Sequence, residues 1–353
     1  MTEHDVFDLV EQGGHETVAF CHDEATGLRA IIAVHSTVLG PGLGGTRFWP
    51  YRSEREALVD VLRLSRGMTY KNAAAGLDLG GGKAVIIGDP RRDRTDDLIR
   101  AYGRAVHGQG GRYLTAEDVG TTQADLDLIR TVTPYATGTT DGSGDPSPAT
   151  AWGVFWAMKA VAAHLWGSDS LEGRTVAVSG VGKVGSALVG HLVEGGAKVL
   201  VADMRDIAVE AMVAAHGATA VATDEIHRAP VDILSPCALG ATLNGVTIPE
   251  MRCAAVCGCA NNQLAEPEDA VRLAEAGILY APDFVVNAGG VINIAEELRG
   301  YERQRAYERI RGIGAAIGRI LATAEEHGIT TEEAAEHVAE ERLQNERRDK
   351  GER

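Results

Sequence analysis

Two lysines lie beside glycines in the first quarter of the chain. Lys71 stands in the stretch MTYKN, and Lys83 follows three glycines and precedes the apolar run AVII. Burial and a cationic neighbour both disfavour the charged form of a lysine, so one of such a pair can act as a base while the other binds a carboxylate. The pair predicts chemistry on a small molecule with a carboxylate, such as an amino acid. A solvated surface charge is the alternative, but it fits poorly a lysine between glycines and an apolar run.

A carboxylate for the same chemistry is present at Asp118, in the stretch TAEDVGT. It could shuttle protons or bind the amino group of a substrate. The glycines before Lys83 resemble a phosphate-binding loop only superficially. The position six before Lys83 is Leu77 rather than glycine, and Ala84 stands where Ser or Thr would hold magnesium. Lys83 is therefore not expected to bind nucleotide phosphate.

A glycine-rich stretch from Gly40 to Arg47, GPGLGGTR, is expected to be a loop whose backbone approaches a small ligand without obstruction by Cβ atoms. Leu43 in this stretch and Ala116 are expected to line a small apolar pocket. A pocket for glutamate would need a cation for the distal carboxylate, and no such cation is evident in the sequence.

A second group of glycines forms the turn GVGKVG, which follows a predicted strand and opens a predicted helix. In this context a GxGxxG motif predicts a dinucleotide site, and a purely structural glycine turn is the alternative. Gly180 permits the tight turn, Gly182 lets the backbone approach the pyrophosphate, and Gly185 lets helix and strand pack closely. The helix N-terminus offers free N–H groups and a favourable dipole to the phosphates. The expected cofactor-binding residues of the turn are Gly180, Val181, Gly182, Lys183, Val184 and Gly185.

Asp203 ends the next predicted strand, where an acidic residue accepts hydrogen bonds from the hydroxyls of the adenosine ribose. Its carboxylate would repel a 2′-phosphate, which favours NAD over NADP as the cofactor. Arg205 lies close by and weakens this inference, and a plain residue at a strand end is the alternative for Asp203.

The elements that position these residues alternate between strand and helix, which indicates an α/β fold. A helix is expected from Ser53 to Arg66, because Ser53 and Glu56 match a capping box and apolar residues recur at helical spacing; the MTYKN stretch would follow it. Strands are expected in this part at 31–35, 84–87 and 113–116.

The stretch TGTTDGSGDPSP at 137–148 cannot continue a helix or a strand, so it predicts a linker between two domains. Beyond it, alternating apolar segments predict a doubly wound parallel sheet of the Rossmann type. The expected helices lie at 152–165 and 186–194, and the expected strands at 175–179, 198–202, 218–222, 233–234, 254–256 and 284–286. The expected domains are an N-terminal α/β substrate-binding and catalytic domain at 1–148, an NAD-binding domain at 149–328 and a C-terminal helix with a frayed tail at 329–353. We expect a cleft between the two domains, and we expect the C-terminal helix to pack back on the first.

Three of the five cysteines, at positions 253, 257 and 259, are close in sequence. Their spacing fits no standard zinc pattern and no second Cys/His pair lies near, so we interpret them as a buried strand with its exit turn and predict no metal.

The composition of the chain limits the kinds of partner that it can bind. A net charge of −16 argues against nucleic acid, because phosphate binding needs a basic surface. The acidic start has no signal-peptide pattern, no stretch approaches about 20 apolar residues, and the cysteine count is odd, so we expect no membrane partner and a cytoplasmic location.

Taken in order, the motifs GPGLGGTRFW, RGMTYKNAAAGLDLGGGKAVI, AEDVGTT, GVGKVG, CANNQLA and VVNAGGVIN resemble those of the leucine/phenylalanine/valine dehydrogenase family. The resemblance covers about residues 13 to 345, and its details are most similar to valine dehydrogenases of actinobacterial type. Cys253 and Cys259 are not part of the family pattern.

The resemblance implies a role for individual residues. Lys83 matches the catalytic lysine that activates water, Lys71 the lysine that binds the substrate carboxylate, and Asp118 the acidic residue in proton transfer. Further matches are Gly44 and Gly45 beside the carboxylate, Asn287 between substrate and cofactor, Asn261 near the nicotinamide ribose, and Thr150 at the nicotinamide amide. Family members are usually homo-oligomers, so we expect one here.

The hypothesis is reversible oxidative deamination of a branched-chain L-amino acid, valine first, to a 2-oxo acid, ammonia and NADH. The same chemistry on leucine, phenylalanine or glutamate stays open, because one methylene changes binding by only about 1–3 kcal/mol. A non-catalytic NAD-binding regulator is a more remote alternative, and both Lys83 and Asp118, whose loss would mark it, are present. The sequence does not fix the preferred amino acid, the oligomeric state, the direction used in the cell or the regulation.

Overall fold

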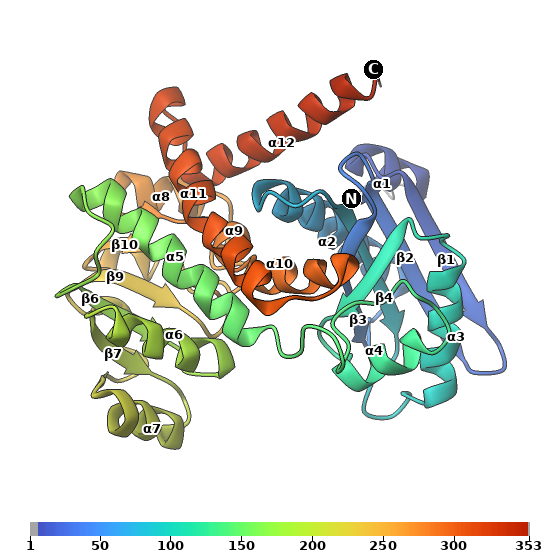
Figure 1. Ribbon diagram of the computed structural model, residues 1–353, viewed down its shortest axis with the longest axis horizontal. Helices are drawn as coiled ribbons and strands as arrows, with labels where there is room; N and C mark the ends of the chain where they lie inside the picture. The colour runs from blue at the N-terminus through green and yellow to red at the C-terminus, as the bar shows by residue number, and fades with distance from the viewer. Residues whose placement is uncertain (1–5, 352–353) are drawn as a thin grey trace. The chain divides into compact units, whose positions relative to one another are not determined.

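The structure is a computed structural model that describes residues 6–351, and the chain divides into two units (Figure 1). The first unit comprises Met1–Gly144, Ile294–Tyr301 and Ala339–Arg353, and the second comprises Asp145–Asn293 and Glu302–Val338.

The first unit contains a five-stranded sheet of β1 (Thr17–Asp23), β2 (Leu28–Ser36), β3 (Gly42–Trp49), β4 (Gly80–Ile87) and β5 (Tyr113–Glu117). The strand order is β1-β2-β4-β3-β5. The pairs β1–β2 and β2–β4 are antiparallel, whereas β3 runs parallel to both β4 and β5. Its helices are α1 (Val6–Gly13), α2 (Glu54–Ala74), α3 (Asp96–His107), α4 (Gln123–Arg130) and the 3-10 helix η3 (Glu296–Arg299).

Helices cover the two faces of this sheet, and alternate residues of β2 point to one or the other. Ile31 packs with Leu58 of α2 in one core cluster. Ile32 packs with Tyr102 of α3 in the other. The central strands are therefore buried on both faces, as a layered α/β domain requires.

Helix α2 is longer than the sequence predicts. Ser53 caps its first turn as expected, accepting a hydrogen bond from the Glu56 N–H at 3.1 Å. The helix runs on to Ala74, so the expectation that MTYKN follows it is wrong: Lys71 lies inside its last turns. The extension rests on tertiary packing, because a Cβ atom at Gly81 of β4 would lie 2.2 Å from the backbone nitrogen of Thr69.

The expected loop from Gly40 to Arg47 is also wrong from Gly42 onward, since this stretch forms β3. Glycine has a low intrinsic preference for strands. Here β3 pairs on both sides, with Gly42 opposite Gly80 of β4 and opposite Tyr113 of β5. Pairing with two neighbours outweighs the local preference, and the same pairing extends β4 back from Ala84 to Gly80.

The second unit contains a six-stranded parallel sheet of β6 (Thr175–Ser179), β7 (Lys198–Ala202), β8 (Thr219–Ala220), β9 (Val231–Pro236), β10 (Cys253–Val256) and β11 (Leu279–Tyr280). Its order, β11-β10-β9-β6-β7-β8, is that of the doubly wound dinucleotide-binding fold. The other elements are α5 (Ser147–Trp166), α6 (Lys183–Glu194), α7 (Asp206–His216), η1 (Ile226–Arg228), η2 (Ile248–Glu250), α8 (Glu268–Glu275), α9 (Asp283–Val286), α10 (Gly289–Ala295), α11 (Arg303–His327) and α12 (Thr331–Asp349).

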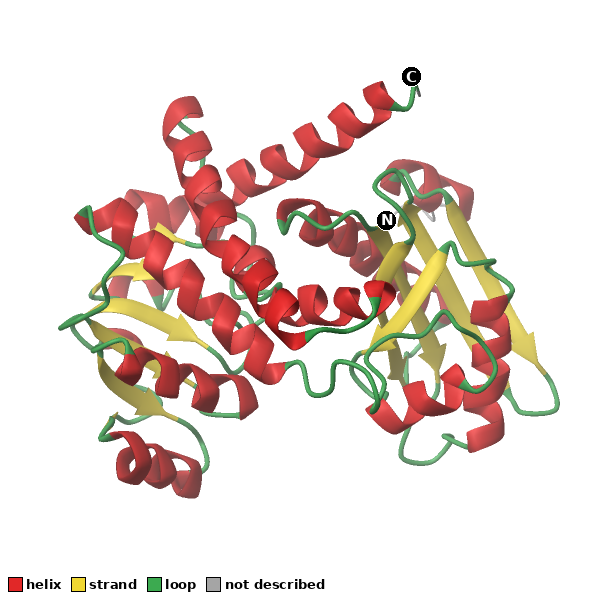
Figure 2. Ribbon diagram, viewed as in Figure 1, coloured by secondary structure: helices red, strands yellow, loops and turns green. Residues whose placement is uncertain are grey.

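Most predicted segments of this unit lie where the sequence indicates, and strands alternate with helices along it (Figure 2). The strands at 175–179 and 198–202 are confirmed residue for residue. The predicted strand at 284–286 is wrong: Asp283–Val286 is helical, and Leu279–Tyr280 is the edge strand instead. Pro282 fixes a backbone angle suited to a helix start and Asp283 is favourable in a first turn, which outweighs the β-branched pair that follows.

Helix α12 begins in the second unit, and its residues from Ala339 onward belong to the first. There the Arg342 guanidinium donates to the Ala73 carbonyl at 3.0 Å and to the Asp78 carboxylate at 2.8 Å. Within residues 6–351, no helix has the length and apolar character needed to cross a membrane.

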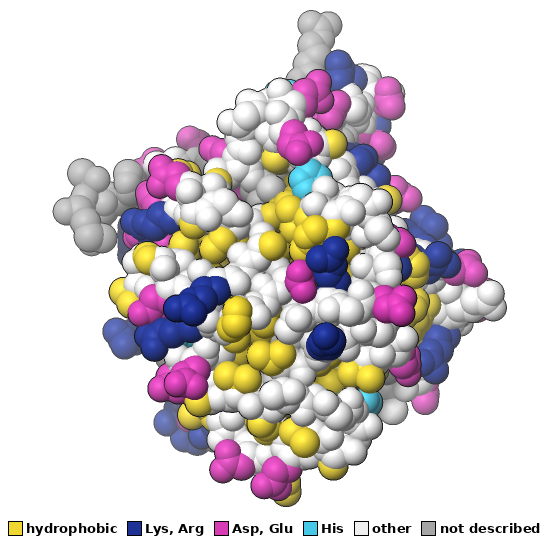
Figure 3. Space-filling view, turned by 90° about the vertical axis from the view of Figure 1, so that its left-hand side faces the viewer, with side chains coloured by type: hydrophobic (Ala, Val, Ile, Leu, Met, Phe, Trp, Pro, Cys, Tyr) yellow, Lys and Arg dark blue, Asp and Glu magenta, His cyan; other side chains and the backbone are white. Residues whose placement is uncertain are grey.

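The surface carries charges of both signs. On the face drawn in Figure 3, lysines and arginines are interspersed with acidic side chains and with groups of apolar ones. They do not gather there into a basic stripe.

Candidate functional site

Lys83 and Asp118 form an ion pair in the first unit. The Lys83 Nζ lies 3.0 Å from Oδ2 of Asp118, and the lysine side chain is only 8% exposed. Lys83 lies on β4, opposite Ala33 of β2, and Asp118 directly follows β5. The parallel arrangement of β4, β3 and β5 brings the two predicted catalytic side chains together from positions 35 residues apart in the sequence.

Two cations surround the Asp118 carboxylate. Besides Lys83, the Nε of Arg47 donates to the same Oδ2 at 3.2 Å. Burial alone would raise the pKa of Asp118, but the charges of Lys83 and Arg47 outweigh it and hold that pKa below its usual range. Asp118 is therefore ionised at neutral pH.

Arg47 is the residue of this group that the sequence reasoning missed. Its Nη1 lies 2.9 Å from Oδ2 of Asp60 on α2, and the Tyr51 hydroxyl donates to the same oxygen at 2.7 Å. Recognising Gly42–Trp49 as a strand would have indicated it, because Arg47 follows Gly45 by two residues and so shares its face.

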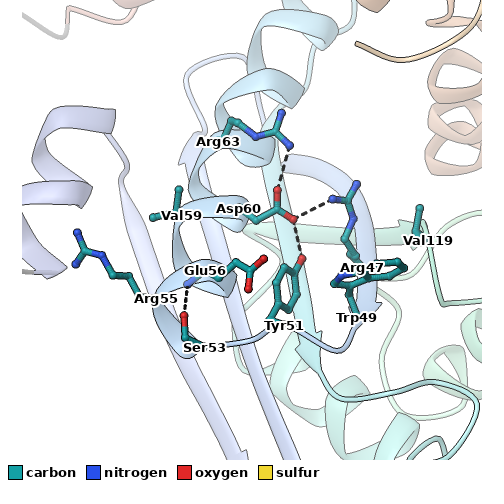
Figure 4. Close-up of a pocket in the computed structure, with 10 residues that line it drawn as sticks. All are labelled: Arg47, Trp49, Tyr51, Ser53, Arg55, Glu56, Val59, Asp60, Arg63 and Val119. Carbon is teal, nitrogen blue, oxygen red and sulfur yellow. Dashed lines mark hydrogen bonds and ion pairs between the residues drawn. The ribbon is translucent and has the colours of Figure 1, made fainter. Parts of the chain in front are cut away.

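A hollow of about 710 Å³ adjoins this network (Figure 4). Its lining includes Arg47 and Asp60 but neither Lys83 nor Asp118. Trp49, Val59 and Val119, which are about half exposed, also line it.

The glycines of β3 allow its neighbours to come close. A Cβ atom at Gly44 would lie 1.9 Å from the carbonyl oxygen of Gly82, and one at Gly45 would lie 2.8 Å from Cβ of Asp118. Side chains there would displace the strand that carries Lys83 and the carboxylate that it contacts. Leu43 is fully buried and Ala116 is 4% exposed.

Lys71 lies where α2 packs on the glycine end of β4. The neighbouring Asn72 is buried, and its Nδ2 donates to the Gly80 carbonyl at 2.6 Å. Lys71 therefore lies in the same unit as Lys83, on the helix that packs on the strand of Lys83.

The glycine turn of the second unit has the geometry of a phosphate cradle. Gly180 has φ +102°, and a Cβ atom there would lie 2.7 Å from that of Ala238. A Cβ atom at Gly185 would lie 2.0 Å from the Gly180 carbonyl oxygen, whereas nothing lies within 4 Å of one at Gly182. Helix α6 begins at Lys183 with Gly182 as its N-cap. No side chain caps this helix, so the N–H groups of its first turn are free to bind a phosphate.

Asp203 lies beside this turn, as predicted. Its Oδ2 accepts a hydrogen bond from the Val181 N–H at 2.9 Å, and its Oδ1 pairs with Nε of Arg205 at 3.1 Å. The hydrogen bond from Arg205 is the largest of several effects that keep the pKa of Asp203 below its usual range. The carboxylate is thus charged, and one cation already contacts it.

A third group in the second unit joins segments far apart in the sequence. Asn287 Nδ2 donates to the Cys259 carbonyl at 3.2 Å and to Oδ1 of Asn261 at 2.9 Å. Asn287 Oδ1 is buried and has no hydrogen-bond partner among the described residues. Thr150, on the first turn of α5, is close to the same region, since a Cβ atom at Gly290 would lie 2.9 Å from its Oγ1.

Cys253 begins β10, as predicted for a buried strand, whereas Cys237 follows the carboxyl end of β9 and Cys257 and Cys259 follow that of β10. Cys257 is buried, and the Cys259 thiol donates a hydrogen bond to Cys237. Burial raises the pKa of Cys253 to about 11. Within residues 6–351, no three His, Cys, Asp or Glu side chains are grouped to hold a metal ion.

Comparison with known proteins identifies families that match the sequence of this chain. Residues 15–135 match the family described as Glu/Leu/Phe/Val dehydrogenase, dimerisation domain, and residues 142–211 and 201–351 match Glutamate/Leucine/Phenylalanine/Valine dehydrogenase. The chain is 51% identical to leucine dehydrogenase of Bacillus subtilis, over 98% of this chain and 95% of that one. It is 52% identical to valine dehydrogenase of Streptomyces virginiae, over 96% of each. A crystal structure of L-tryptophan dehydrogenase from Nostoc punctiforme superposes with a TM-score of 0.89 at 44% identity, over 97% of this chain and 100% of that one.

Proposed function

Because the chain belongs to the Glu/Leu/Phe/Val dehydrogenase family and is thus an amino-acid dehydrogenase, we propose that it catalyses the NAD-dependent, reversible oxidative deamination of a branched-chain L-amino acid. The products are a 2-oxo acid, ammonia and NADH. The observation that carries the proposal is the buried ion pair of Lys83 and Asp118, which places a lysine Nζ that can exchange a proton 3.0 Å from a charged carboxylate.

In the proposed mechanism, Lys71 binds the carboxylate of the amino acid, beside the backbone of Gly44 and Gly45. A bound nicotinamide supplies the hydride acceptor for the substrate Cα. Lys83, in its neutral form, then accepts a proton from the water that attacks the resulting imine carbon. Asp118 moves protons to and from the substrate nitrogen as ammonia leaves.

The second unit fits a nicotinamide dinucleotide. The open space at Gly182 and the uncapped N-terminus of α6 suit a pyrophosphate. The unpartnered Oδ1 of Asn287 suits an amide N–H donor, such as the nicotinamide carboxamide. We assign cofactor contacts to the six residues of the turn, and further contacts to Asp203, Asn261 and Thr150.

NAD is the proposed cofactor because of Asp203. Its charged carboxylate lies beside the glycine turn, where it would accept hydrogen bonds from the ribose hydroxyls and repel a 2′-phosphate.

Valine is the proposed preferred substrate, with leucine next. The family resemblance in the motifs and the apolar character of Leu43 and Ala116 support a branched apolar side chain. Identities of 51% to a leucine enzyme and 52% to a valine enzyme favour neither over the other. The discrimination available from one methylene is about 1–3 kcal/mol, so both amino acids should react.

We further propose that the first unit supplies substrate binding and catalysis, that the second binds NAD, and that the chain forms a homo-oligomer. The match of residues 15–135 to a family of dimerisation domains supports the last point.

Initial rates of NADH formation at alkaline pH, with valine, leucine, isoleucine, phenylalanine and glutamate, test the proposal. We expect rapid turnover of valine and leucine with NAD and little with NADP. Turnover of phenylalanine or glutamate alone would contradict the proposed pocket. NAD binding without turnover of any amino acid would contradict the proposed reaction.

A further inference from the structure

Arg47 links the proposed catalytic pair to helix α2. Its side chain is 23% exposed and bridges two carboxylates, with Nε 3.2 Å from Oδ2 of Asp118 and Nη1 2.9 Å from Oδ2 of Asp60. Lys83 and Arg47 contact the same oxygen of Asp118, which fixes the carboxylate between them.

Asp60, the second carboxylate that Arg47 contacts, has hydrogen-bond and ion-pair partners of its own. Figure 4 shows Asp60 between Arg47 and Arg63, with the Tyr51 hydroxyl directed at the same carboxylate. The Asp60 side chain is 17% exposed, and Arg63 lies 3.0 Å from its Oδ1. Because α2 packs on the sheet through its apolar face, Asp60 gives Arg47 a fixed partner on a rigid element.

The structure assigns to Arg47 the role of a positioning residue: it fixes the Asp118 carboxylate in contact with Lys83, using Asp60 as its anchor. This inference rests on the proposed function, since it concerns the geometry of the proposed catalytic pair. Arg47 itself transfers no proton in the reaction.

The electrostatic surroundings of Asp118 set the direction of the effect. Lys83 faces it from β4 and Arg47 from β3, and burial of the carboxyl group opposes ionisation. The charge of Asp118 in turn raises the pKa of Tyr113 on β5. Removing Arg47 leaves one cation against the same burial, so the pKa of Asp118 rises. Loss of an opposite charge at this range changes a carboxyl pKa by about 1–3 units.

The test compares Arg47→Gln with Arg63→Gln, in the full-length enzyme. Both variants remove one arginine from Asp60, but only the first removes a contact with Asp118. For Arg47→Gln we expect kcat to fall about 10- to 100-fold, since a small misplacement of a reacting group has effects of this size. We expect the acid limb of the kcat–pH profile to move up by about one unit. Arg63→Gln should keep both kcat and the acid limb close to wild type.

Arg47→Lys separates charge from geometry. A lysine keeps the positive charge but cannot present two forked N–H groups to two carboxylates. We expect its acid limb to stay near that of wild type while kcat falls. If Arg47→Gln does not fold, as judged by circular dichroism and thermal unfolding, the comparison of Arg47→Lys with wild type decides the question.

Two outcomes would overturn the inference. One is an unshifted acid limb in Arg47→Gln with wild-type kcat. The other is a loss of activity that Arg63→Gln shares, or that follows only the fraction of unfolded protein in each variant. The proposed function is judged separately, on amino-acid oxidation by the wild-type enzyme, so it can hold while the role of Arg47 fails.

Discussion

At the scale of single residues, the proposed preference for NAD rests on Asp203 and its neighbour Arg205. In the structure the two side chains form an ion pair, with Nε of Arg205 3.1 Å from Oδ1 of Asp203, and the arginine side chain is 61% exposed. The carboxylate would repel a 2′-phosphate, and it also pairs with Arg205, which could otherwise bind such a group. The sequence predicts Asp203 at the end of its strand with Arg205 close by, but it could not show that the two side chains form an ion pair.

Replacing Asp203 by Ser should relax this preference. The change removes the repulsion and releases Arg205, so we expect the KM for NADP to fall and the KM for NAD to rise. Initial rates with both cofactors at saturating valine measure this. In the double variant Asp203→Ser with Arg205→Gln the gain in NADP use should disappear, and a gain that persisted there would rule out Arg205 as its cause.

At the scale of elements, the contact of α2 with β4 decides where the lysines lie. A Cβ atom at Gly81 would lie 2.1 Å from Oγ1 of Thr69 and 2.6 Å from the Ser65 carbonyl oxygen. The glycines before Lys83 therefore serve close packing of a helix on a strand. A glycine triplet before a lysine looks the same in sequence whether it cradles phosphate or admits a helix.

The strands that the sequence could predict are those with signals in their own neighbourhood. The strands at 175–179 and 198–202 are marked by local signals, an apolar run that ends at a glycine turn or at an aspartate. The strand Gly42–Trp49 carries no such local signal. It forms because segments about 40 and 70 residues further on pair with it. Arg47 was missed for the same reason, since its partners Asp60 and Asp118 come together only in three dimensions.

Gly81→Ala should destabilise the first unit, because its new methyl group would meet helix backbone that cannot move cheaply. We expect a loss of about 1–3 kcal/mol or more in the free energy of unfolding, seen as a lower midpoint in urea. Gly67→Ala is the matched control: it lies on α2 with nothing within 4 Å of the added Cβ. Alanine is the better helix former by about 1 kcal/mol, so that variant should be as stable as wild type or more so. Equal midpoints for the two variants would contradict this account of the packing.

At the scale of the whole molecule, the chain places different chemistry in its two units. The ion pair of Lys83 and Asp118 and the helix of Lys71 belong to the first unit. The glycine turn, Asp203 and the Asn261–Asn287 pair belong to the second. Residues 15–135, which match one family domain, lie in the first unit, and the match from residue 142 onward includes the whole of the second unit and the later segments of the first.

The division predicts that turnover and nucleotide binding respond to different substitutions.

The central claim is that Lys83 is the base of an amino-acid dehydrogenase, and the most direct test measures kcat for valine oxidation and the Kd for NAD in Lys83→Ala. We expect kcat to fall roughly 10³-fold, the size of a general-base contribution, while the Kd for NAD stays near that of wild type. The exposed Lys198, changed to Ala in the same way, should alter neither quantity. Wild-type turnover in Lys83→Ala would contradict the claim.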